Sequence, residues 1–214
     1  LHPVSNYGLA LHTVSSVLGL AIANVEGDRR VQTWDLGRAT SNVLHTYLME
    51  FIQPQTWTDL SFITVAQGPG GFTGTRIGMV TARTLAQQLD LPVLPISTLA
   101  AVAWEWWMQQ TEPTANPAIA VQMPAQRGEV FGAIYRPGQS AWPSLTTEWS
   151  DRSLPHADWE HTLATWPEPV HVIQANTPAT AIGAMLDLAW GQWHAGVRSH
   201  WAAALPFYGQ HPVT

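Results

Sequence analysis

The sequence predicts an α/β protein of two lobes, each built on a mixed sheet flanked by helices. Three observations predict this class: an opening run of three strand-like segments, a later alternation of strand and helix patterns, and a proline-containing break at residues 111–117 after which strands begin again. A β-β-β-α-β-α-β-α order is typical of a mixed sheet with helices on its faces. A chain of 214 residues can supply two small lobes that share an interface. We therefore expect a first lobe over residues 1–110 and a smaller, divergent second lobe over residues 111–214.

The first lobe contains five apolar segments with strand-like patterns, and turn or helix signals separate them. These segments are residues 9–13, 17–23, 31–36, 62–66 and 91–96. The first three form a meander, because only short turns containing Ser or Gly lie between them. Helices are predicted over about 41–52, 76–90 and 97–110, each following a capping residue or a glycine-rich loop.

The second lobe begins as a hairpin, because the strand-like residues 118–123 and 129–135 bracket a turn that contains Gly128. Residues 170–174 read as a further strand, and a helix is predicted over 178–190. The intervening residues 136–169 are rich in Pro, Trp and Ser and show no clear period, so no element is predicted there.

The composition excludes several kinds of catalytic site. The nine basic residues are all Arg, and a chain without Lys has no P-loop lysine, Schiff-base lysine or Ser-Lys dyad. The chain also lacks Cys, which excludes disulfides, thiolate nucleophiles and cysteine zinc sites and agrees with a reducing compartment. Only 11% of the residues are charged, and the net charge is −6. A sparsely charged surface favours contacts with other proteins over direct binding to a nucleic-acid backbone.

Neither a membrane span nor a signal peptide is predicted. The most apolar stretch, residues 91–104, is interrupted by Pro92 and Pro95 and is shorter than the roughly 18 residues that a span requires. Residues 1–25 contain no charged side chain, but they lack the basic start of a signal peptide and fit a strand pair better. We expect a soluble, cytoplasmic protein.

The most informative segment is a glycine-rich loop between a strand and a helix. Its residues are Gly68, Pro69, Gly70, Gly71, Phe72, Thr73, Gly74 and, at the start of the helix, Arg76. Such a loop is often an anion site, but it matches neither the P-loop motif nor the dinucleotide fingerprint, which requires Gly where Thr73 stands. Two interpretations stay open: a sharp turn with tight helix packing, or a phosphate-binding loop. Arg76 is expected to contact either the loop or a partner.

No catalytic, cofactor-binding or metal-binding residue is predicted. The nine His residues form no metal-binding spacing, and His156 and His161 lie on different faces of any helix that contains both. His12 is expected to be a hydrogen-bonded structural residue. Glu129 follows a turn, and because no second carboxylate is placed near it, a role in stabilising the turn is favoured.

The glycine-rich loop resembles the hallmark of the TsaB family, also called YeaZ, in which Gly-Pro-Gly-Ser-Phe-Thr-Gly-x-Arg-Ile-Gly opens a long helix. The resemblance extends over residues 9 to about 135 and includes the segments 84–86, 96–100 and 127–131. The chain departs from the family at residues 12–14, where His-Thr-Val replaces Asp-Thr-Ser, and at residues 124–126, where Pro-Ala-Gln replaces Asp-Ala-Arg. Both changes remove charge that active relatives of the fold use to hold metal and phosphate.

The resemblance implies the two-lobed actin-like ATPase fold (ASKHA, ribonuclease H-like) without independent enzymatic activity. Family members pair with the catalytic subunit TsaD. With the small ATPase TsaE, this pair transfers threonylcarbamoyl to the adenosine beside the anticodon of tRNA. On this reading the chain is a scaffold without a cofactor of its own, and it meets tRNA only through the complex. The alternative is an actin-like kinase or ATPase that uses residues 68–74 as its phosphate loop.

The resemblance also places the partner surface on the first two helices of the first lobe, here about residues 41–52 and 75–88, and the same surface forms homodimers when the partner is missing. The expected partner-facing residues are Val43, Leu44, Tyr47, Leu48, Phe51, Ile77, Val80, Thr81, Thr84 and Gln88. The apolar stripe of the first helix can instead pack on its own sheet. The second helix carries apolar or small residues on more than one face, as burial on two sides requires.

Overall fold

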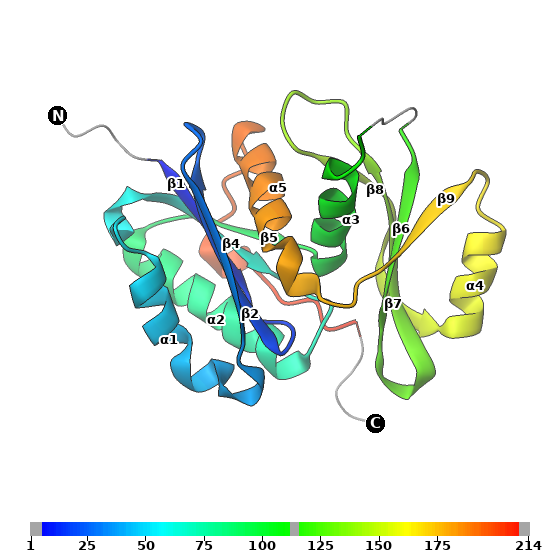
Figure 1. Cartoon of the computed structure of the whole chain (residues 1–214), viewed down its shortest axis with the longest axis horizontal. Coiled ribbons are helices and arrows are strands. Elements are labelled where there is room, and N and C mark those ends of the chain that lie inside the picture. The colour runs from blue at the N-terminus through cyan, green and yellow to red at the C-terminus, as the bar shows by residue number, and fades with distance from the viewer. Residues whose placement is uncertain (1–5, 112–115, 210–214) are drawn as a thin grey trace.

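The computed structural model describes residues 6–111 and 116–209, which form two mixed sheets with helices between and around them (Figure 1). The first sheet contains β1 (Tyr7–His12), β2 (Val17–Asn24), β3 (Arg29–Asp35), β4 (Leu60–Ala66) and β5 (Val93–Ile96), in the order β3-β2-β1-β4-β5. The second contains β6 (Ala118–Pro124), β7 (Glu129–Pro137), β8 (Leu145–Pro155) and β9 (Val170–Gln174), in the order β8-β7-β6-β9. The α-helices are α1 (Thr40–Phe51), α2 (Phe72–Leu89), α3 (Thr98–Met108), α4 (His156–Ala164) and α5 (Ile182–His194).

Both sheets are mixed, as the sequence predicts. In the first, β1, β2 and β3 form an antiparallel meander, while β4 and β5 run parallel to β1. In the second, β6, β7 and β8 are antiparallel neighbours and β9 runs parallel to β6. Both sheets therefore begin with a hairpin and add a parallel strand on the other side of their first strand.

The helices cover the first sheet on both faces. Leu9 and Leu11 of β1 belong to the core that α1 and α2 close, while Ala10 points to the opposite face and packs in the core around α3 and α5. This alternation follows from the period of two along a strand, and the small side chain of Ala10 lets α5 lie close to the sheet. All six residues of β1 are buried as a result.

The helices α3 and α5 lie between the two sheets (Figure 1). Their apolar side chains share one core with Phe62 of the first sheet and with Ile119 and Val121 of the second. The helix α4 covers the outer face of the second sheet, where Trp159 is fully buried. Gly132 of β7 makes room for this indole, because a Cβ there would lie 2.8 Å from the Trp159 ring.

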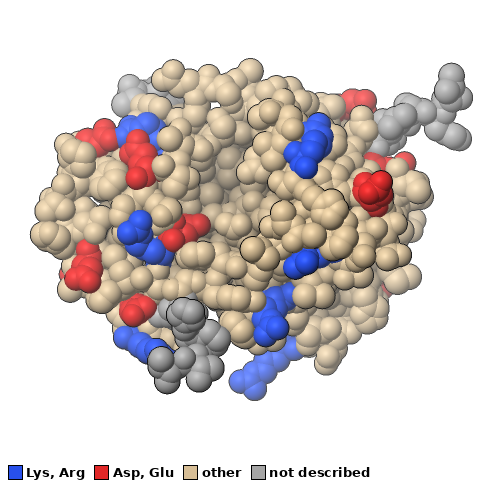
Figure 2. Space-filling view, turned by 180° about the vertical axis from the view of Figure 1, so that it is seen from behind, with Lys and Arg blue, Asp and Glu red and all other residues tan. Residues whose placement is uncertain are grey.

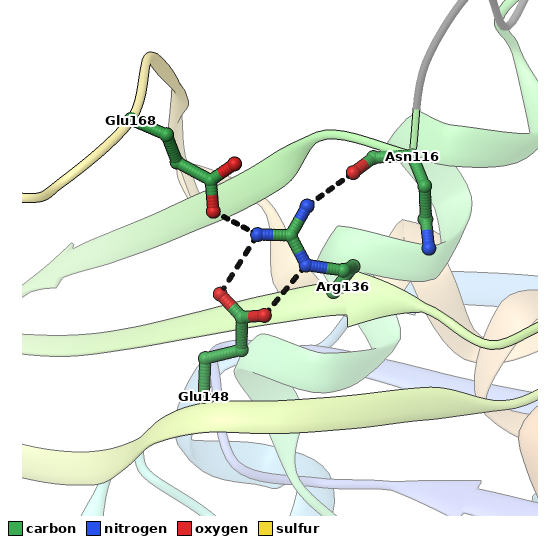
Figure 3. Close-up of polar contacts among 4 residues, drawn as sticks. All are labelled: Asn116, Arg136, Glu148 and Glu168. Atoms are coloured by element: carbon green, nitrogen blue, oxygen red, sulfur yellow. Dashed lines mark hydrogen bonds and ion pairs between the residues drawn. The ribbon is translucent and has the colours of Figure 1, made fainter.

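An ion-pair cluster centred on Arg136 joins separate segments of the second sheet (Figure 3). The guanidinium of Arg136 on β7 binds both carboxylate oxygens of Glu148 on β8, and the closer contact, from Nε, is 2.5 Å. It also donates to the carboxylate of Glu168, which precedes β9, and to the main-chain carbonyl of Asn116, which precedes β6. One side chain therefore ties together the ends of all four strands.

Two predicted helix starts and one stretch without a predicted element need correction. The helix expected to begin at Arg76 begins at Phe72, so the last residues of the glycine-rich loop form its first turn. The helix expected over residues 178–190 opens with a 3₁₀ turn, Pro178–Ala181, before α5 begins. Residues 136–169, where no element was predicted, contain β8 and α4. Two register shifts against β7 disturb the period of β8, which explains why its sequence pattern is weak.

The division of the chain between residues 110 and 111 stays a prediction. The strands agree with this division, because the strands of the first sheet come from residues 7–96 and those of the second from residues 118–174. The helix α5 disagrees with it, because it belongs to the later part of the chain but packs against β1, β2, β4 and β5 of the first sheet.

Replacing Arg136 with Gln is expected to lower the free energy of unfolding by about 1–2 kcal/mol, because Glu148, whose side chain is 24% exposed, loses its charged partner. Urea unfolding at neutral pH measures the change. Arg38→Gln is the control, since Arg38 is exposed and its replacement should change stability by less than about 0.5 kcal/mol. Equal effects of the two variants would show that the cluster adds nothing to stability.

Candidate functional site

The glycine-rich loop folds tightly onto the turn that follows β1. The main-chain N–H of Gly71 donates to the carbonyl of Val14 at 2.7 Å, and the hydroxyl of Thr13 donates to the carbonyl of Gly74 at 2.7 Å. At the start of α2, both the N–H and the hydroxyl of Thr75 donate to the carbonyl of Gly71 at 2.9 Å. The loop is therefore bound to residues 13 and 14 from two sides.

The glycines of this loop are required by close approaches of the backbone. A Cβ on Gly74 would lie 2.0 Å from the carbonyl oxygen of Thr13, and one on Gly70 would lie 2.6 Å from that of Val14. Gly68 adopts a φ of +106°, and a Cβ there would lie 2.2 Å from the carbonyl oxygen of Phe207. Of the two interpretations of the loop, tight packing accounts for these contacts.

A cavity of about 550 Å³ lies between the glycine-rich loop and the β6–β7 turn of the second sheet. Phe72 and Tyr208 form part of its wall, with ring centroids 4.6 Å apart. Arg127 is the charged side chain among the described residues that line it, and none of these lining residues is a carboxylate. The lining therefore offers no carboxylate ligand for the Mg²⁺ of a nucleotide.

His12 ends β1 and is 2% exposed. Its ring nitrogens make no hydrogen bond of standard geometry with any residue in the described part of the chain, which corrects the expectation of a hydrogen-bonded histidine. Burial lowers the pKa of His12 from 6.5 to about 4, although the nearby carbonyls of Val17 and of His12 itself act in the opposite direction. His12 is therefore neutral at pH 7.

The outer face of α2 presents an exposed surface on which Arg76 and Arg83 are the charged residues nearest to Val80. Val80, in the middle of this helix, is 62% exposed, and Thr84 and Gln88 are also exposed. Ile77 and Thr81 beside them are half-buried. These five predicted partner-facing residues are accessible to another molecule.

The predicted residues on α1 divide into two groups. Leu44, Leu48 and Phe51 are buried in the core beneath the first sheet. For these three residues the alternative interpretation holds, in which the stripe packs on the sheet of its own lobe. Val43 and Tyr47 are half-buried and remain partly accessible. The stripe faces the sheet because a helix on a sheet buries its apolar side first.

Met49 on α1 is 63% exposed, and sequence reasoning did not select it. Its position in the helical pattern could have identified it, because a methionine on the side of a helix opposite to the apolar stripe does not reach the core of its own lobe. Met49 adds an apolar side chain to the exposed surface of α1.

The remaining candidates are engaged in local contacts. Arg76 lies over the ring of Phe72, with its guanidinium carbon 5.3 Å from the ring centroid, so it contacts the start of its own helix. Glu129 accepts a hydrogen bond of 2.5 Å from the hydroxyl of Ser153, which links β7 to β8. His156 and His161 are both exposed on α4. Within residues 6–111 and 116–209, no group of three His, Asp or Glu is placed to hold a metal ion.

Charge is sparse on the molecular surface. Figure 2 shows Arg, Asp and Glu side chains scattered over a face that is mostly uncharged. Among the helices of the described residues, none combines the length and the apolar character that crossing a membrane would require.

Comparison with known proteins finds relatives that are named for tRNA modification. Residues 47–151 match the family model TsaD, described as tRNA N6-adenosine threonylcarbamoyltransferase. The chain is 33% identical over 112 residues to the tRNA threonylcarbamoyladenosine biosynthesis protein TsaB of Bacillus subtilis, which covers 52% of this chain and 45% of the relative. It is 35% identical over 92 residues to the protein of that name from Escherichia coli, covering 42% and 38%. The match thus spans less than half the length of these curated relatives.

Solved structures extend the similarity to nearly the whole chain at the level of the fold. YeaZ from Pseudomonas aeruginosa superimposes with a TM-score of 0.77 at 22% identity, over 95% of this chain and 99% of that one. A P. aeruginosa protein described as similar to peptidase YeaZ gives a TM-score of 0.76 at 23% identity, over 96% and 100%. Together with the two mixed sheets flanked by helices, these neighbours confirm the predicted two-lobed actin-like fold.

Gly74→Ala is expected to lower the free energy of unfolding by about 1–3 kcal/mol, since the added Cβ overlaps a main-chain oxygen that cannot rotate away. Gly71→Ala is the matched control in the same loop. Its nearest contact would be 3.4 Å and its backbone is extended, so we expect a change below about 0.5 kcal/mol. Urea unfolding compares the two, and equal stability of both variants would contradict the tight-packing interpretation.

His12 is expected to make the protein sensitive to acid. Its folded pKa of about 4 lies below the unfolded value, so the unfolded state takes up the proton first and stability falls as the pH drops from about 6.5 to 4. At pH 4.5 this contribution amounts to about 2–3 kcal/mol.

His12→Leu removes the titrating group, so the difference in unfolding free energy between about pH 7 and pH 4.5 should shrink by the same about 2–3 kcal/mol. Urea unfolding at both pH values measures it. An unchanged difference in the variant would show that His12 is solvated or hydrogen-bonded in solution.

Proposed function

We propose that this chain, which belongs to the TsaB (YeaZ) family, is a non-catalytic subunit of the complex that adds threonylcarbamoyl to the adenosine beside the anticodon of tRNA. The names of its relatives and the match of residues 47–151 to the TsaD family model support this role. In this proposal the chain works in the cytoplasm, pairs with a TsaD-like catalytic subunit and forms a homodimer without it. A TsaE-like ATPase completes the machinery, and tRNA is bound only through the complex.

The observation that carries the proposal is the exposed valine in the middle of α2. Val80 lies on a helix of 18 residues and is 62% exposed, and Ile77 and Thr84 on the same side carry no charge. Arg76 and Arg83, one turn before and after Val80 on the same face, are the charged neighbours. An exposed apolar side chain flanked by uncharged residues and by arginine fits a protein interface, where Arg is enriched while Lys, Glu and Asp are depleted. The outer face of α2 is therefore the proposed centre of the partner surface.

The burial of the α1 stripe removes three residues from the set that we propose to contact the partner. Leu44, Leu48 and Phe51 support the surface from below, because their side chains are part of the core. The contact set that we propose is Val43, Tyr47, Ile77, Val80, Thr81, Thr84 and Gln88, extended by Met49. Both helices cover the same face of the first sheet, so one partner can contact both (Figure 1).

The absence of catalysis by this chain alone belongs to the same proposal. Two features support it: the glycine-rich loop uses the N–H of Gly71 and the carbonyl of Gly74 to bind residues 13 and 14, and the adjoining cavity is lined without a carboxylate. The alternative, a kinase or ATPase that uses residues 68–74, would need free loop amides and a metal ligand there. No observation favours it.

The test is the mass in solution of the chain, of a TsaD-like subunit from the same source, and of their mixture, measured by light scattering. The wild-type mixture is expected to show a one-to-one pair. Val80→Glu should weaken pairing by about tenfold or more, because a carboxylate would be buried in an apolar contact. The variant should remain folded, since the Val80 side chain points to solvent in the isolated chain.

Val25→Glu is the matched control, because Val25 is 54% exposed but lies in the β2–β3 turn. It should pair like the wild type. If the wild-type chain forms no complex with the TsaD-like subunit, the proposed function is overturned. If Val80→Glu pairs as well as the wild type, the partner surface does not lie on α2.

A further inference from the structure

A second cavity, of about 410 Å³, lies where α3 and α5 meet both sheets. It shares no lining residue with the cavity beside the glycine-rich loop. Its lining includes the polar residues Ser97, Tyr135, Asp151 and Gln192 and the apolar residues Ile96 and Leu188. The volume is in the range of sites that bind small molecules, and the mixture of apolar walls with a few polar groups is typical of them.

The polar residues of this cavity form a directed chain of hydrogen bonds. The hydroxyl of Ser97 caps α3 by accepting from the N–H groups of Leu99 and Ala100 at 3.1 and 3.2 Å. The hydroxyl of Tyr135 donates to Oδ1 of Asp151 at 2.5 Å, so the contact of 3.1 Å between Ser97 and Tyr135 has Ser97 as its donor. The chain therefore ends at the carboxylate of Asp151.

A register shift in β8 aims this carboxylate into the cavity. Along β8, Trp149 pairs with Ile134 while Arg152 pairs with Gly132, so three steps on β8 match two on β7. The extra residue changes which side chains face inward, as β-bulges do. Trp149 packs with α4 on the outer face of the second sheet, and Asp151 lines the cavity on the inner face.

Within the described part of the chain, the negative charge of Asp151 has no cationic partner. Among the described residues that line the cavity, Asp151 is the one with a formal charge, and it takes part in none of the ion pairs of the described chain. Its two hydrogen-bond partners, Tyr135 and Ser97, are neutral. Burial raises the pKa of Asp151, which shows that the carboxylate is poorly compensated when ionised.

The rim of the cavity is held in place before any ligand arrives. The loop between β7 and β8 lies directly on α5, because a Cβ on Gly191 would sit 1.7 Å from the carbonyl oxygen of Pro143. Trp142 of this loop stacks on His194 of α5, with ring centroids 3.4 Å apart and planes 8° apart. A preformed wall reduces the entropy that a ligand must lose to bind.

We propose that this cavity binds a small organic cation, a primary ammonium group on a short aliphatic body. The ammonium group is held by the carboxylate of Asp151, and the side-chain amide oxygens of Gln67 and Gln192 can accept its remaining hydrogens. Ile96 and Leu188 contact the aliphatic body. An anion finds no basic side chain in this lining. The inference is independent of the proposed function, because it uses no residue of the α2 surface.

The test is isothermal titration of the full chain with 1,5-diaminopentane at low ionic strength. The matched neutral probe is 1,5-pentanediol and the matched anion is glutarate. The diamine is expected to bind about tenfold or more tightly than the diol, since a charge-assisted hydrogen bond is about twice as strong as a neutral one and is joined by the attraction between the charges. Glutarate should not bind.

Asp151→Asn should weaken binding of the diamine about tenfold or more. Glu105→Gln is the control, because Glu105 is another partly buried carboxylate with a raised pKa but lines a different cavity. This variant should retain the wild-type affinity. Val197→Trp provides a second variant that leaves the hydrogen-bond chain untouched, since Val197 is 37% exposed and lines the cavity. Filling the mouth with an indole should abolish binding.

Three results would overturn the proposal: no binding of the diamine up to about 10 mM, equal binding of diamine and diol, or unchanged diamine affinity in both Asp151→Asn and Val197→Trp. Thermal unfolding establishes that each variant is folded. If Asp151→Asn fails to fold, the comparison of the three probes on the wild type and on Val197→Trp still decides the question.

Discussion

The contact between two stretches of backbone, the glycine-rich loop and the turn after β1, is the constraint on which the first lobe depends. It brings the carbonyl of Thr13 so close to Gly74 that no side chain fits between them. The contact fixes where α2 begins and how it is rotated about its axis. That rotation places Met79, Ala82 and Ala86 in the core and leaves Val80 outside. The same glycines that suggest a phosphate site in the sequence thus serve to present a helix face.

Much of the fold follows from local patterns in the sequence. The meander, the α1 stripe and the hairpin that opens the second lobe are read from the period of apolar residues and from turn residues, which act over a few positions. The sequence pattern places the start of α2 four residues too late because residues 72–75, Phe-Thr-Gly-Thr, are all poor or mediocre helix formers, and a tertiary contact overrides that preference. The strand β8 was missed because its register shifts break the alternation by which strands are recognised.

The two candidate sites also differ in how far the sequence predicts them. The exposure of Val80 on α2 could be anticipated, since apolar residues on more than one face of a helix cannot all pack on its own sheet. The cluster of Ser97, Tyr135 and Asp151 could not, because its members come from three elements whose juxtaposition depends on both sheets packing against α3. A cap residue at Ser97 was visible in the sequence, but nothing local indicates that a tyrosine 38 positions later would reach it.

The helix α5 is synthesised late but packs on the sheet that is synthesised first. The inner face of the first sheet, which contains Ala10 and Phe62, is covered by a helix that follows the whole second sheet in sequence. A nascent chain that has completed β5 therefore carries a sheet with one bare apolar face until the ribosome has released residues 182–194. Contacts of such long sequence separation slow folding, and the uncovered face can recruit chaperones or other chains in the meantime. A helix made after the whole second sheet thus completes the first sheet.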